Sequence, residues 1–478
     1  MSSSSQGEVV YTPQREARSA FPMAAILLVL GVGVLLPMAL ARGLTTNSEL
    51  KVVALELCLL GTLAVLLQPF WGLVLVVGLL YVRPEESIAA LAGMRFTLLV
   101  SLVALASVLA HLFLSREKLV RTPFNVMLLG FAATAILSTV PNWNMAEAVL
   151  EISKLVILVL LVLNLVRTPQ RYRAFVTTLL VFTAYLALYS IYLYFTGGAM
   201  QQGELARSQA TGIFSDPNDL AATVAAGLAL ALVRARNARG LMRLVYLLLA
   251  GSQVWAVVLT YSRSGLLSLL LVICGFLICS MRRKAISTVL AVGLGILLFV
   301  VAPSRMTDFD RSEASANQRF WLWSDGLQQL YGRPLTGIGY GQFPEINGGW
   351  TAHNSFVLCF TELGLPGYFF WMGCLYYCFK RRVPKATPEE ESEEEKRDLV
   401  GARLALSGFL FSGFWLSRTY VPVLYLLMCL PVAAQIAARG RPGPQQVKGA
   451  EWLRDCGRIG LISLGSILLI QLMTDFLK

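Results

Sequence analysis

The chain has 478 residues, of which 56% are hydrophobic and only 14% are charged. Because an ordinary soluble domain is about 25% charged, this composition argues against a soluble globular enzyme, and the high hydrophobicity argues against a disordered chain. The net charge of +12 is also typical of nucleic-acid binding, but the basic residues lie in short clusters between apolar runs. Since membrane proteins fix their topology in this way, we expect no nucleic-acid partner.

Apolar segments recur along the whole chain. A membrane-crossing helix needs about 20 mostly apolar residues, and some candidate segments are short or broken by proline, so we expect about 12–15 spans. The predicted fold class is all-α, a polytopic transmembrane helical bundle, because only helices fit these lengths in lipid. The candidate spans are 22–41, 50–67, 69–82, 95–114, 123–140, 148–166, 174–196, 218–233, 243–261, 264–281, 286–302, 353–379, 399–417, 420–437 and 458–476.

Lysine and arginine are concentrated in alternate connections between the spans. With a cytoplasmic N-terminus, the richest connections also face the cytoplasm, as the positive-inside rule requires. No small-residue cleavage pattern follows the first span, so we expect it to stay in the protein. The predicted organisation is a disordered cytoplasmic tail at 1–20, a transmembrane bundle at 21–302, an outer loop forming a cap at 303–352, and C-terminal transmembrane helices at 353–478 with a cytoplasmic loop at 381–398.

The eight cysteines show no CxxC pattern and no spacing with histidine that would suit a metal ion. None falls in a long outer connection, so we expect neither a disulfide nor a metal site from them. Cys374 and Cys378 share one helix face, where small apolar residues pack well. The triplet Asp308, Phe309, Asp310 resembles a DxD metal motif, which leaves a weak alternative to the expectation of no metal.

Two long connections lie on the outer side, namely 197–217 and the predicted cap. Long loops in compact proteins are usually functional or disordered. Within the cap, the apolar spacing at 315–332 predicts an amphipathic helix on the membrane surface or over a cavity. The following segment GIGYGQF, at 337–343, is a glycine-rich turn whose backbone N–H groups could face a ligand closely. Gly339 and Tyr340 are therefore candidate substrate-binding residues.

The two histidines differ in their expected place. His111 lies at an inner helix end, whereas His353 stands at an outer helix start, directly before Asn354. A lone histidine at such a position has two readings, as a structural residue or as a general base. The second reading rests on chemistry, because histidine is the side chain that titrates near neutrality.

Several arginines lie on the outer side, where the positive-inside rule disfavours them. Arg263 interrupts the apolar stretch 245–281, and Arg207 and Arg319 lie in the two long outer connections. Each could be a plain turn residue, or the partner of a buried anion. Arginine suits phosphate, because its planar fork binds two oxygens at once. These arginines and His353 together favour a membrane-embedded site that acts on a phosphate-bearing lipid.

Four segments carry a resemblance to a known family. In their order and spacing they resemble the O-antigen ligase and polymerase superfamily, which includes lipopolysaccharide O-antigen ligases, repeat-unit polymerases and protein O-oligosaccharyltransferases. The resemblance covers about 200–380 well and the spans before it loosely. The segments are ATGIFSDPNDLA (210–221), TYSRSG (260–265), NQRFWLWSDGLQQLYGRPLTGIGYGQF (317–343) and HNSFVLCFTELGLPG (353–367).

The resemblance implies glycan transfer from an undecaprenyl pyrophosphate carrier at the periplasmic face of the bacterial inner membrane. The acceptor hydroxyl attacks C1 of the donor sugar, the lipid pyrophosphate leaves, and no metal ion or other cofactor takes part. By the same resemblance, Arg263 and Arg319 would neutralise the leaving pyrophosphate. His353 would activate or orient the acceptor hydroxyl.

Other positions in these motifs are expected to support the site. Glu362 matches the acidic position of the family in the following helix and would supply a hydrogen bond to the site, and Asn354 would contact the substrate. Arg207 would also bind substrate, although it stands a few residues before the place where the family often has an arginine. Asp216 and Asn218 match the start of a helix, which either residue could cap.

Four functions remain open. A ligase would move a finished glycan to a lipid A-core, a polymerase would extend a growing glycan, and a protein O-oligosaccharyltransferase would modify a protein. A transporter belongs to another class and would favour internal repeats and broken helices at mid-membrane. The polar residues gather at one face instead, which argues against a transporter. Among the glycan-transfer functions we expect the ligase, with the glycan-bearing carrier, the acceptor and membrane lipids as its partners.

Overall fold

The structure is a computed structural model. It describes residues 61, 64–83, 86, 96–114, 119–142, 145–202, 205–281, 283–301, 314–380, 392–438 and 449–476. The predicted tail at 1–20, the predicted span 22–41, most of 50–67 and the triplet Asp308–Asp310 lie outside the described residues.

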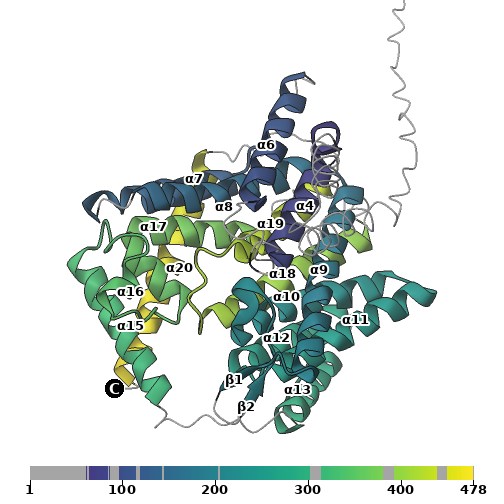
Figure 1. The fold of residues 1–478 in the computed structure, drawn as a ribbon. Coiled ribbons are helices and arrows are strands. Elements are labelled where there is room, and N and C mark those ends of the chain that lie inside the picture. Colours follow the sequence, from purple (N-terminus) through teal and green to yellow (C-terminus); the bar gives the residue numbers. More distant parts are fainter. Residues whose placement is uncertain are drawn as a thin grey trace, which may run out of the picture.

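The described chain is almost entirely helical (Figure 1), so the prediction of an all-α polytopic bundle is confirmed. Every predicted span from 69–82 onward coincides with a helix. The described helices are α4 (Pro69–Val82), α6 (Phe96–Leu114), α7 (Pro123–Leu137), η3 (Val140–Asn142), α8 (Met145–Leu165), α9 (Pro169–Phe195), η4 (Gly212–Ser215), α10 (Pro217–Asn237), α11 (Gly240–Leu259), α12 (Arg263–Ser280), α13 (Lys284–Val301), α15 (Ala314–Gly332), α16 (Phe343–Ile346), α17 (Ser355–Phe379), α18 (Glu393–Gly413), α19 (Pro422–Ala437) and α20 (Gly449–Phe476).

Seven of the described helices are long and apolar enough to cross a membrane, namely α8, α9, α10, α11, α12, α17 and α20. Shorter apolar helices accompany them. Leucine, isoleucine and valine side chains are exposed along α11, α13 and α20. In water such apolar faces would be a liability, whereas in a bilayer they contact lipid. The chain is therefore a multi-pass membrane protein.

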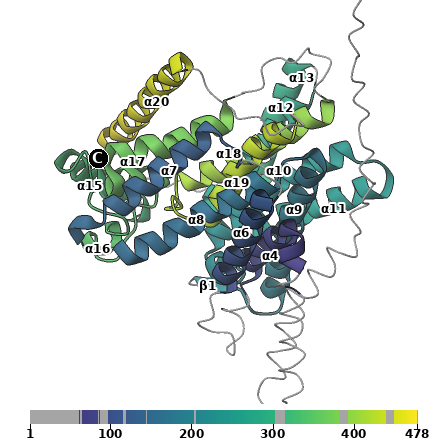
Figure 2. The same ribbon diagram turned by 90° about the horizontal axis from the view of Figure 1, so that it is seen from above.

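Two groups of helices make up the bundle (Figures 1 and 2). In one group, α10 lies at the centre and packs against α9, α11, α12 and α18. In the other, α17 packs against α7, α15 and α20. Helix α19 contacts α8, α17 and α18, so it joins the two groups. Helices α10 and α17 are therefore the central helices of the two groups.

The amphipathic helix predicted at 315–332 is α15, and its apolar side is buried. Leu322, Trp323, Leu327 and Leu330 lie against the bundle. The only strands among the described residues form a short antiparallel hairpin, β1 (Met200–Gln202) with β2 (Leu205–Arg207). This hairpin lies within the first of the two long connections. Both long connections thus contain ordered structure that can hold side chains in place.

One boundary differs from the expectation. Residues 393–398, expected to lie in a loop, form the first turns of α18. The reason is a capping box, in which the Ser392 hydroxyl accepts from the Glu395 N–H at 3.2 Å and the Glu395 carboxylate accepts from the Ser392 N–H at 3.2 Å. Three glutamates in the first turn also suit the positive end of the helix dipole. The acidic run is therefore a helix start.

Candidate functional site

His353 lies in a tight turn directly before α17. Its φ is +47°, a left-handed conformation that is uncommon for any residue but glycine. Both sides of the turn are held: the Trp323 indole donates to the Ala352 carbonyl at 2.9 Å, and the Asn354 side chain accepts from the Phe356 N–H at 2.8 Å, which caps α17. The backbone of His353 is thus fixed by α15 and α17 together.

A second segment binds the same turn, namely the connection 414–421 between α18 and α19. The Ser355 hydroxyl accepts from the Arg418 N–H at 2.8 Å, and the Ser355 carbonyl accepts from the Thr419 hydroxyl at 2.7 Å. The Thr351 hydroxyl donates to the Ser417 hydroxyl. Bonds therefore flank His353 on both sides along the chain, and they anchor it to a segment more than sixty residues away.

The Arg418 side chain links this turn to the start of α10. Its guanidinium forms a two-pronged ion pair with the carboxylate of Asp219, in the first turn of α10. Its Nη2 also lies 3.7 Å from the Asp216 carboxylate. Asp216 in turn caps α10 by accepting from the Asn218 N–H at 2.8 Å. Such bidentate pairs fix direction as well as distance, so the starts of α10 and α17 are held in one geometry.

Arg207 and the turn before α12 meet on the other side of Asn218. The Asn218 side-chain oxygen accepts from Arg207 Nη2 at 3.0 Å and from the Ser262 hydroxyl at 2.8 Å. Arg207 Nε donates to the Thr260 carbonyl at 2.8 Å, and the side chain is buried. Arg263 follows Ser262 as the first residue of α12 and is partly buried. Arg207 therefore holds the turn that presents Arg263.

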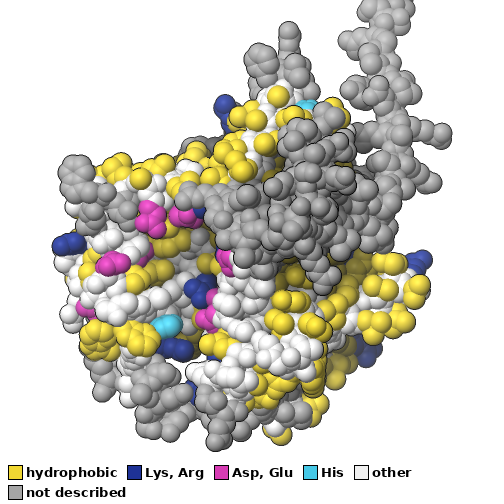
Figure 3. Space-filling view, in the orientation of Figure 1, with side chains coloured by type: hydrophobic (Ala, Val, Ile, Leu, Met, Phe, Trp, Pro, Cys, Tyr) yellow, Lys and Arg dark blue, Asp and Glu magenta, His cyan; other side chains and the backbone are white. Residues whose placement is uncertain are grey.

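The charges around His353 determine its protonation. Burial and the positive charges of Arg319 and Arg418 lower the pKa of His353 below its ordinary value, and the carboxylate of Asp216 opposes them. A histidine with a lowered pKa is neutral at neutral pH and can accept a proton. Figure 3 shows a histidine next to basic side chains, with acidic side chains close by, below and to the left of the centre of this face. We call His353, Arg319, Arg418, Asp216 and Asp219 the charged cluster.

The glycine-rich turn 337–343 lies against α17. The Gly339 N–H donates to the Glu362 carbonyl at 2.9 Å, and the Tyr340 N–H donates to the Ser138 hydroxyl at 3.0 Å. The Glu362 carboxylate accepts from the Phe343 N–H at 3.1 Å. These N–H groups were expected to face a ligand, but they bind the protein itself. The close backbone approach for which glycine is needed is an approach to α17.

The kink of α17 explains why the turn fits there. Gly364 has a φ of +65° inside the helix, and Pro366 follows it. A Cβ on Gly364 would lie 2.7 Å from the Pro334 carbonyl oxygen, and a Cβ on Gly337 would strike the Glu362 carbonyl. The freed Leu365 N–H donates to the Pro334 carbonyl at 2.8 Å. Two glycines thus allow two backbones to touch where the helix is broken.

Tyr340 has an acidic and aromatic environment. Its ring meets the ring of Tyr420 at 4.6 Å between centroids. Burial and the negative charges of Glu151, Glu362 and Glu147 raise the pKa of Tyr340 above its ordinary value. The phenol therefore stays protonated and can donate a hydrogen bond.

The predicted site residues lie in two separate groups. His353 and Arg319 belong to the charged cluster, and Arg207 and Arg263 adjoin it through Asn218. Glu362, Gly339 and Tyr340 form a second group. Eight helical residues separate Asn354 from Glu362, which is about 12 Å along the axis, so this second group lies deeper along α17.

Asn354 has a split role. Its side-chain oxygen caps α17, whereas its Nδ2 is buried and has no hydrogen-bond partner within the part of the chain that the structure describes. Only this amide group remains as the part that could meet a substrate.

Sequence analysis missed Arg418 and Asp219. A signal existed, because Arg418 stands in the very short connection between α18 and α19, which the predicted topology puts on the outer side, where the positive-inside rule disfavours arginine. Its partner could not be found in this way, since Asp219 is 199 residues distant. Among the described residues, no three His, Cys, Asp or Glu side chains gather as metal ligands would.

Residues 246–372 match the family model described as O-antigen ligase, and the match includes Arg263, Arg319, His353 and Glu362. No curated protein matches the chain. The resemblance seen in the sequence motifs is confirmed over this segment, which supports a membrane glycosyltransferase. Residues 246–372 are therefore similar to the O-antigen ligase family.

Proposed function

We propose that the chain is an O-antigen ligase-like glycosyltransferase. It would move a glycan from undecaprenyl pyrophosphate to a hydroxyl of the lipid A-core at the periplasmic face of the bacterial inner membrane. The observation that carries the proposal is the charged cluster, where His353 stands directly before α17 and the positive charges of Arg319 and Arg418 act on it. This pairs a base with fixed positive charge, which is what transfer from a pyrophosphate requires.

The arginines would act on the leaving group. When the bond between sugar C1 and the phosphate oxygen breaks, negative charge develops on the departing pyrophosphate. Fixed cations aimed at that charge stabilise it without reorganising. Arg263 and Arg319 would contact the phosphates, whereas Arg207 would act as a positioning residue, because its guanidinium holds Asn218 and the Thr260 carbonyl.

His353 would act on the acceptor. Its neutral imidazole would accept the proton of the acceptor hydroxyl as the hydroxyl oxygen forms a bond to C1 of the donor sugar. The C1–O bond to the pyrophosphate breaks in the same reaction, and the electron pair leaves with the carrier lipid. The products are the glycosylated acceptor, undecaprenyl pyrophosphate and a proton on His353. Positive charge comes from arginine, so we propose that no metal ion or other cofactor takes part.

The test is a gel analysis of surface glycans and carrier-linked glycans in a strain without the gene, with the wild type or His353→Ala restored. His111→Ala is the matched control, because His111 lies on α6 and bonds the Ser107 carbonyl at 2.9 Å. The ligase proposal expects complete polymer on the carrier and none on lipid A-core with His353→Ala, and a normal pattern with His111→Ala.

Three results would change the proposal. A single repeat unit on the acceptor without a ladder would mean a polymerase, and an unchanged pattern in the strain without the gene would contradict glycan transfer in that pathway. Loss of glycan from a protein, with normal lipopolysaccharide, would mean a protein O-oligosaccharyltransferase.

A further inference from the structure

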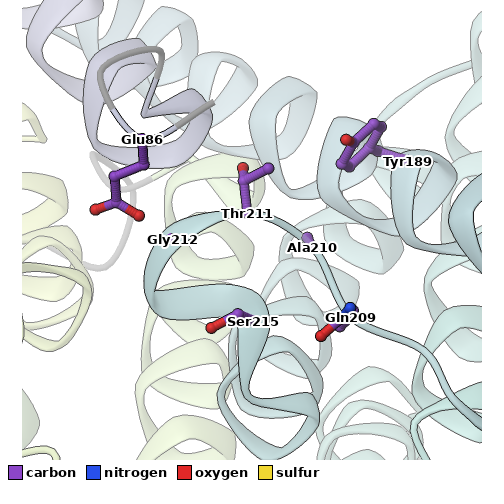
Figure 4. Close-up of a pocket in the computed structure, with 7 residues that line it drawn as sticks. All are labelled: Glu86, Tyr189, Gln209, Ala210, Thr211, Gly212 and Ser215. Atoms are coloured by element: carbon purple, nitrogen blue, oxygen red, sulfur yellow. The ribbon is translucent and has the colours of Figure 1, made fainter. Parts of the chain in front are cut away.

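A second feature of the outer connections is a pocket that none of the predicted site residues lines. Its volume is about 530 Å³, and it opens between the end of α4, the middle of α9 and the segment 209–215. Figure 4 shows Glu86 and Tyr189 on opposite sides of the turn that carries Thr211, with Gln209 and Ser215 on the same segment.

The side chains of the pocket suit a hydroxyl-rich ligand. They offer a carboxylate, an amide, two aliphatic hydroxyls and a phenol ring, from Glu86, Gln209, Thr211, Ser215 and Tyr189. Such groups donate to and accept from sugar hydroxyls, and an aromatic ring packs on the apolar side of a sugar. The described residues that line the pocket include no lysine or arginine, so it lacks the fork that favours phosphate.

The pocket wall is built by specific contacts. Gly212 has a φ of +66°, and a Cβ there would strike the Arg83 side chain and lie 2.7 Å from a carboxylate oxygen of Glu86. Arg83 pairs with Glu86. The Thr211 hydroxyl donates to the Val82 carbonyl at 3.3 Å, and Gln209 Nε2 donates to the Gly198 carbonyl at 3.0 Å. The turn therefore sits tightly against α4 with its polar side chains in place.

The pocket adjoins the charged cluster along the chain. Ser215 lines the pocket, and the next residue, Asp216, has its carboxylate 3.7 Å from Arg418. At the other end of the segment, Gln209 lies two residues after Arg207, which bonds Asn218. The segment that forms the pocket therefore continues directly along the chain into Asp216 of the charged cluster.

We propose that the pocket at 209–215 is a saccharide subsite that binds a sugar ring of the substrate glycan through its hydroxyl groups. This inference rests on the proposed function, because it takes the pyrophosphate to lie at Arg263 and Arg319. The glycan could belong to the donor or to the acceptor, since both present the same hydroxyl chemistry.

The test measures how tightly the purified full-length protein binds two carrier lipids. Ser215→Trp fills the pocket from an exposed position, and Tyr189→Leu removes the phenol as a second variant. Gln201→Trp is the control, because Gln201 is an exposed residue of β1 outside the pocket. The probes are undecaprenyl pyrophosphate bearing the native repeat unit and undecaprenyl pyrophosphate without sugar. We expect Ser215→Trp and Tyr189→Leu to lower the affinity for the glycan-bearing carrier roughly tenfold. Their affinity for the carrier without sugar should stay unchanged.

The other outcomes are equally informative. If the pocket variants raise KM for the acceptor and leave donor binding unchanged, the bound sugar belongs to the acceptor. Equal weakening of both carriers, or no change in carrier binding and in acceptor KM, would overturn the subsite. If the wild type bound neither carrier, the proposed function would fail. Binding of the free repeat-unit oligosaccharide would then decide the subsite alone, with loss in Ser215→Trp supporting it and no loss overturning it.

Discussion

At the scale of single residues, the arginines at the outer end have different surroundings. Arg207 is buried and bonds Asn218 and the Thr260 carbonyl, and Arg418 forms its ion pair with Asp219. Arg263 begins α12 and Arg319 lies beside His353. Loss of Arg207 or Arg418 should therefore disturb structure, and loss of Arg319 should also change the charge around His353.

The first prediction concerns Arg263. Arg263→Ala should lower glycan transfer by at least about 10²–10³-fold, the usual cost of removing one preorganised donor from a developing charge, with insertion and thermal stability unchanged. Arg243→Ala, at an exposed position at the other end of α11, is the control and should transfer normally. Transfer assays in membranes measure the activity of both variants, and thermal melts of the purified proteins measure their stability. Normal transfer by Arg263→Ala would refute its placement at the pyrophosphate.

The second prediction concerns the pKa of His353. Arg319 and Arg418 lower this pKa, so a charge removed from Arg319 should raise it. If neutral His353 is the base, kcat/KM rises with pH through this pKa and then levels off. Arg319→Gln should therefore move the acid limb of the profile to higher pH, in addition to any loss of rate. An acid limb that stays in place, measured over the same pH range with Arg319→Lys as the charge-retaining control, would exclude His353 as the titrating group.

At the scale of elements, the ion pair between Arg418 and Asp219 joins α10 to the connection before α19. Removing Arg418 leaves the partly buried carboxylate of Asp219 without the guanidinium that pairs with it. We expect Arg418→Ala to lower the free energy of unfolding by about 1–3 kcal/mol, less than for a fully buried pair, because the Arg418 side chain is 25% exposed. The double variant Arg418→Ala with Asp219→Ala should regain part of this loss in a double-mutant cycle. Strictly additive losses would mean that the pair contributes nothing.

The glycine-rich turn offers a matched test of backbone contact. Gly337 and Gly341 both have positive φ, of +64° and +74°. A Cβ on Gly337 would strike the Glu362 carbonyl, whereas a Cβ on Gly341 would meet nothing within 4 Å. Gly341→Ala should therefore cost about 1–2 kcal/mol of conformational strain, and Gly337→Ala clearly more. Thermal melts in the same detergent would compare them, and equal losses would show that the turn does not need its contact with α17.

The elements differ in how far the sequence could predict them. The spans were predictable because lipid requires each crossing backbone to satisfy its own hydrogen bonds as a helix, and α15 was predictable from its apolar spacing. The docking of turn 337–343 was not, because the partners of Gly339 and Tyr340 are Glu362 and Ser138, and no local pattern pairs such distant groups. The start of α18 was mistaken because its acidic run was taken as a solvated charge run, although Ser392 and Glu395 form a capping box.

The same contrast holds for the site. Arg263, Arg319 and His353 stood out as polar residues among apolar spans, so sequence alone could propose them. Arg418 carried a sequence signal through its place in a short connection, but its pairing with Asp219 depends on how the fold brings the start of α10 to the connection before α19. Residues that hold others in place are the ones that need the fold.

At the scale of the whole molecule, α19 joins the two helix groups (Figure 2). Arg418 pairs with Asp219 at the start of α10, and its N–H donates to the Ser355 hydroxyl at the start of α17. His353 lies in the turn before α17, Arg263 is the first residue of α12, Arg319 lies on α15, and the pocket segment 209–215 ends directly before Asp216. Because arginine supplies the positive charge in this account, EDTA should leave transfer by the purified protein unchanged. An EDTA-sensitive rate that magnesium restores would require a metal ion in the mechanism.

The central claim is that His353 acts on the acceptor while the arginines act on the pyrophosphate. The most direct measurement compares donor binding and transfer by purified His353→Ala, with undecaprenyl pyrophosphate bearing the native repeat unit as the donor. The account predicts donor affinity equal to that of the wild type and transfer lowered by about 10²–10⁴-fold, the range of general base catalysis. Loss of donor affinity would move His353 to the phosphate site, and normal transfer would contradict the account.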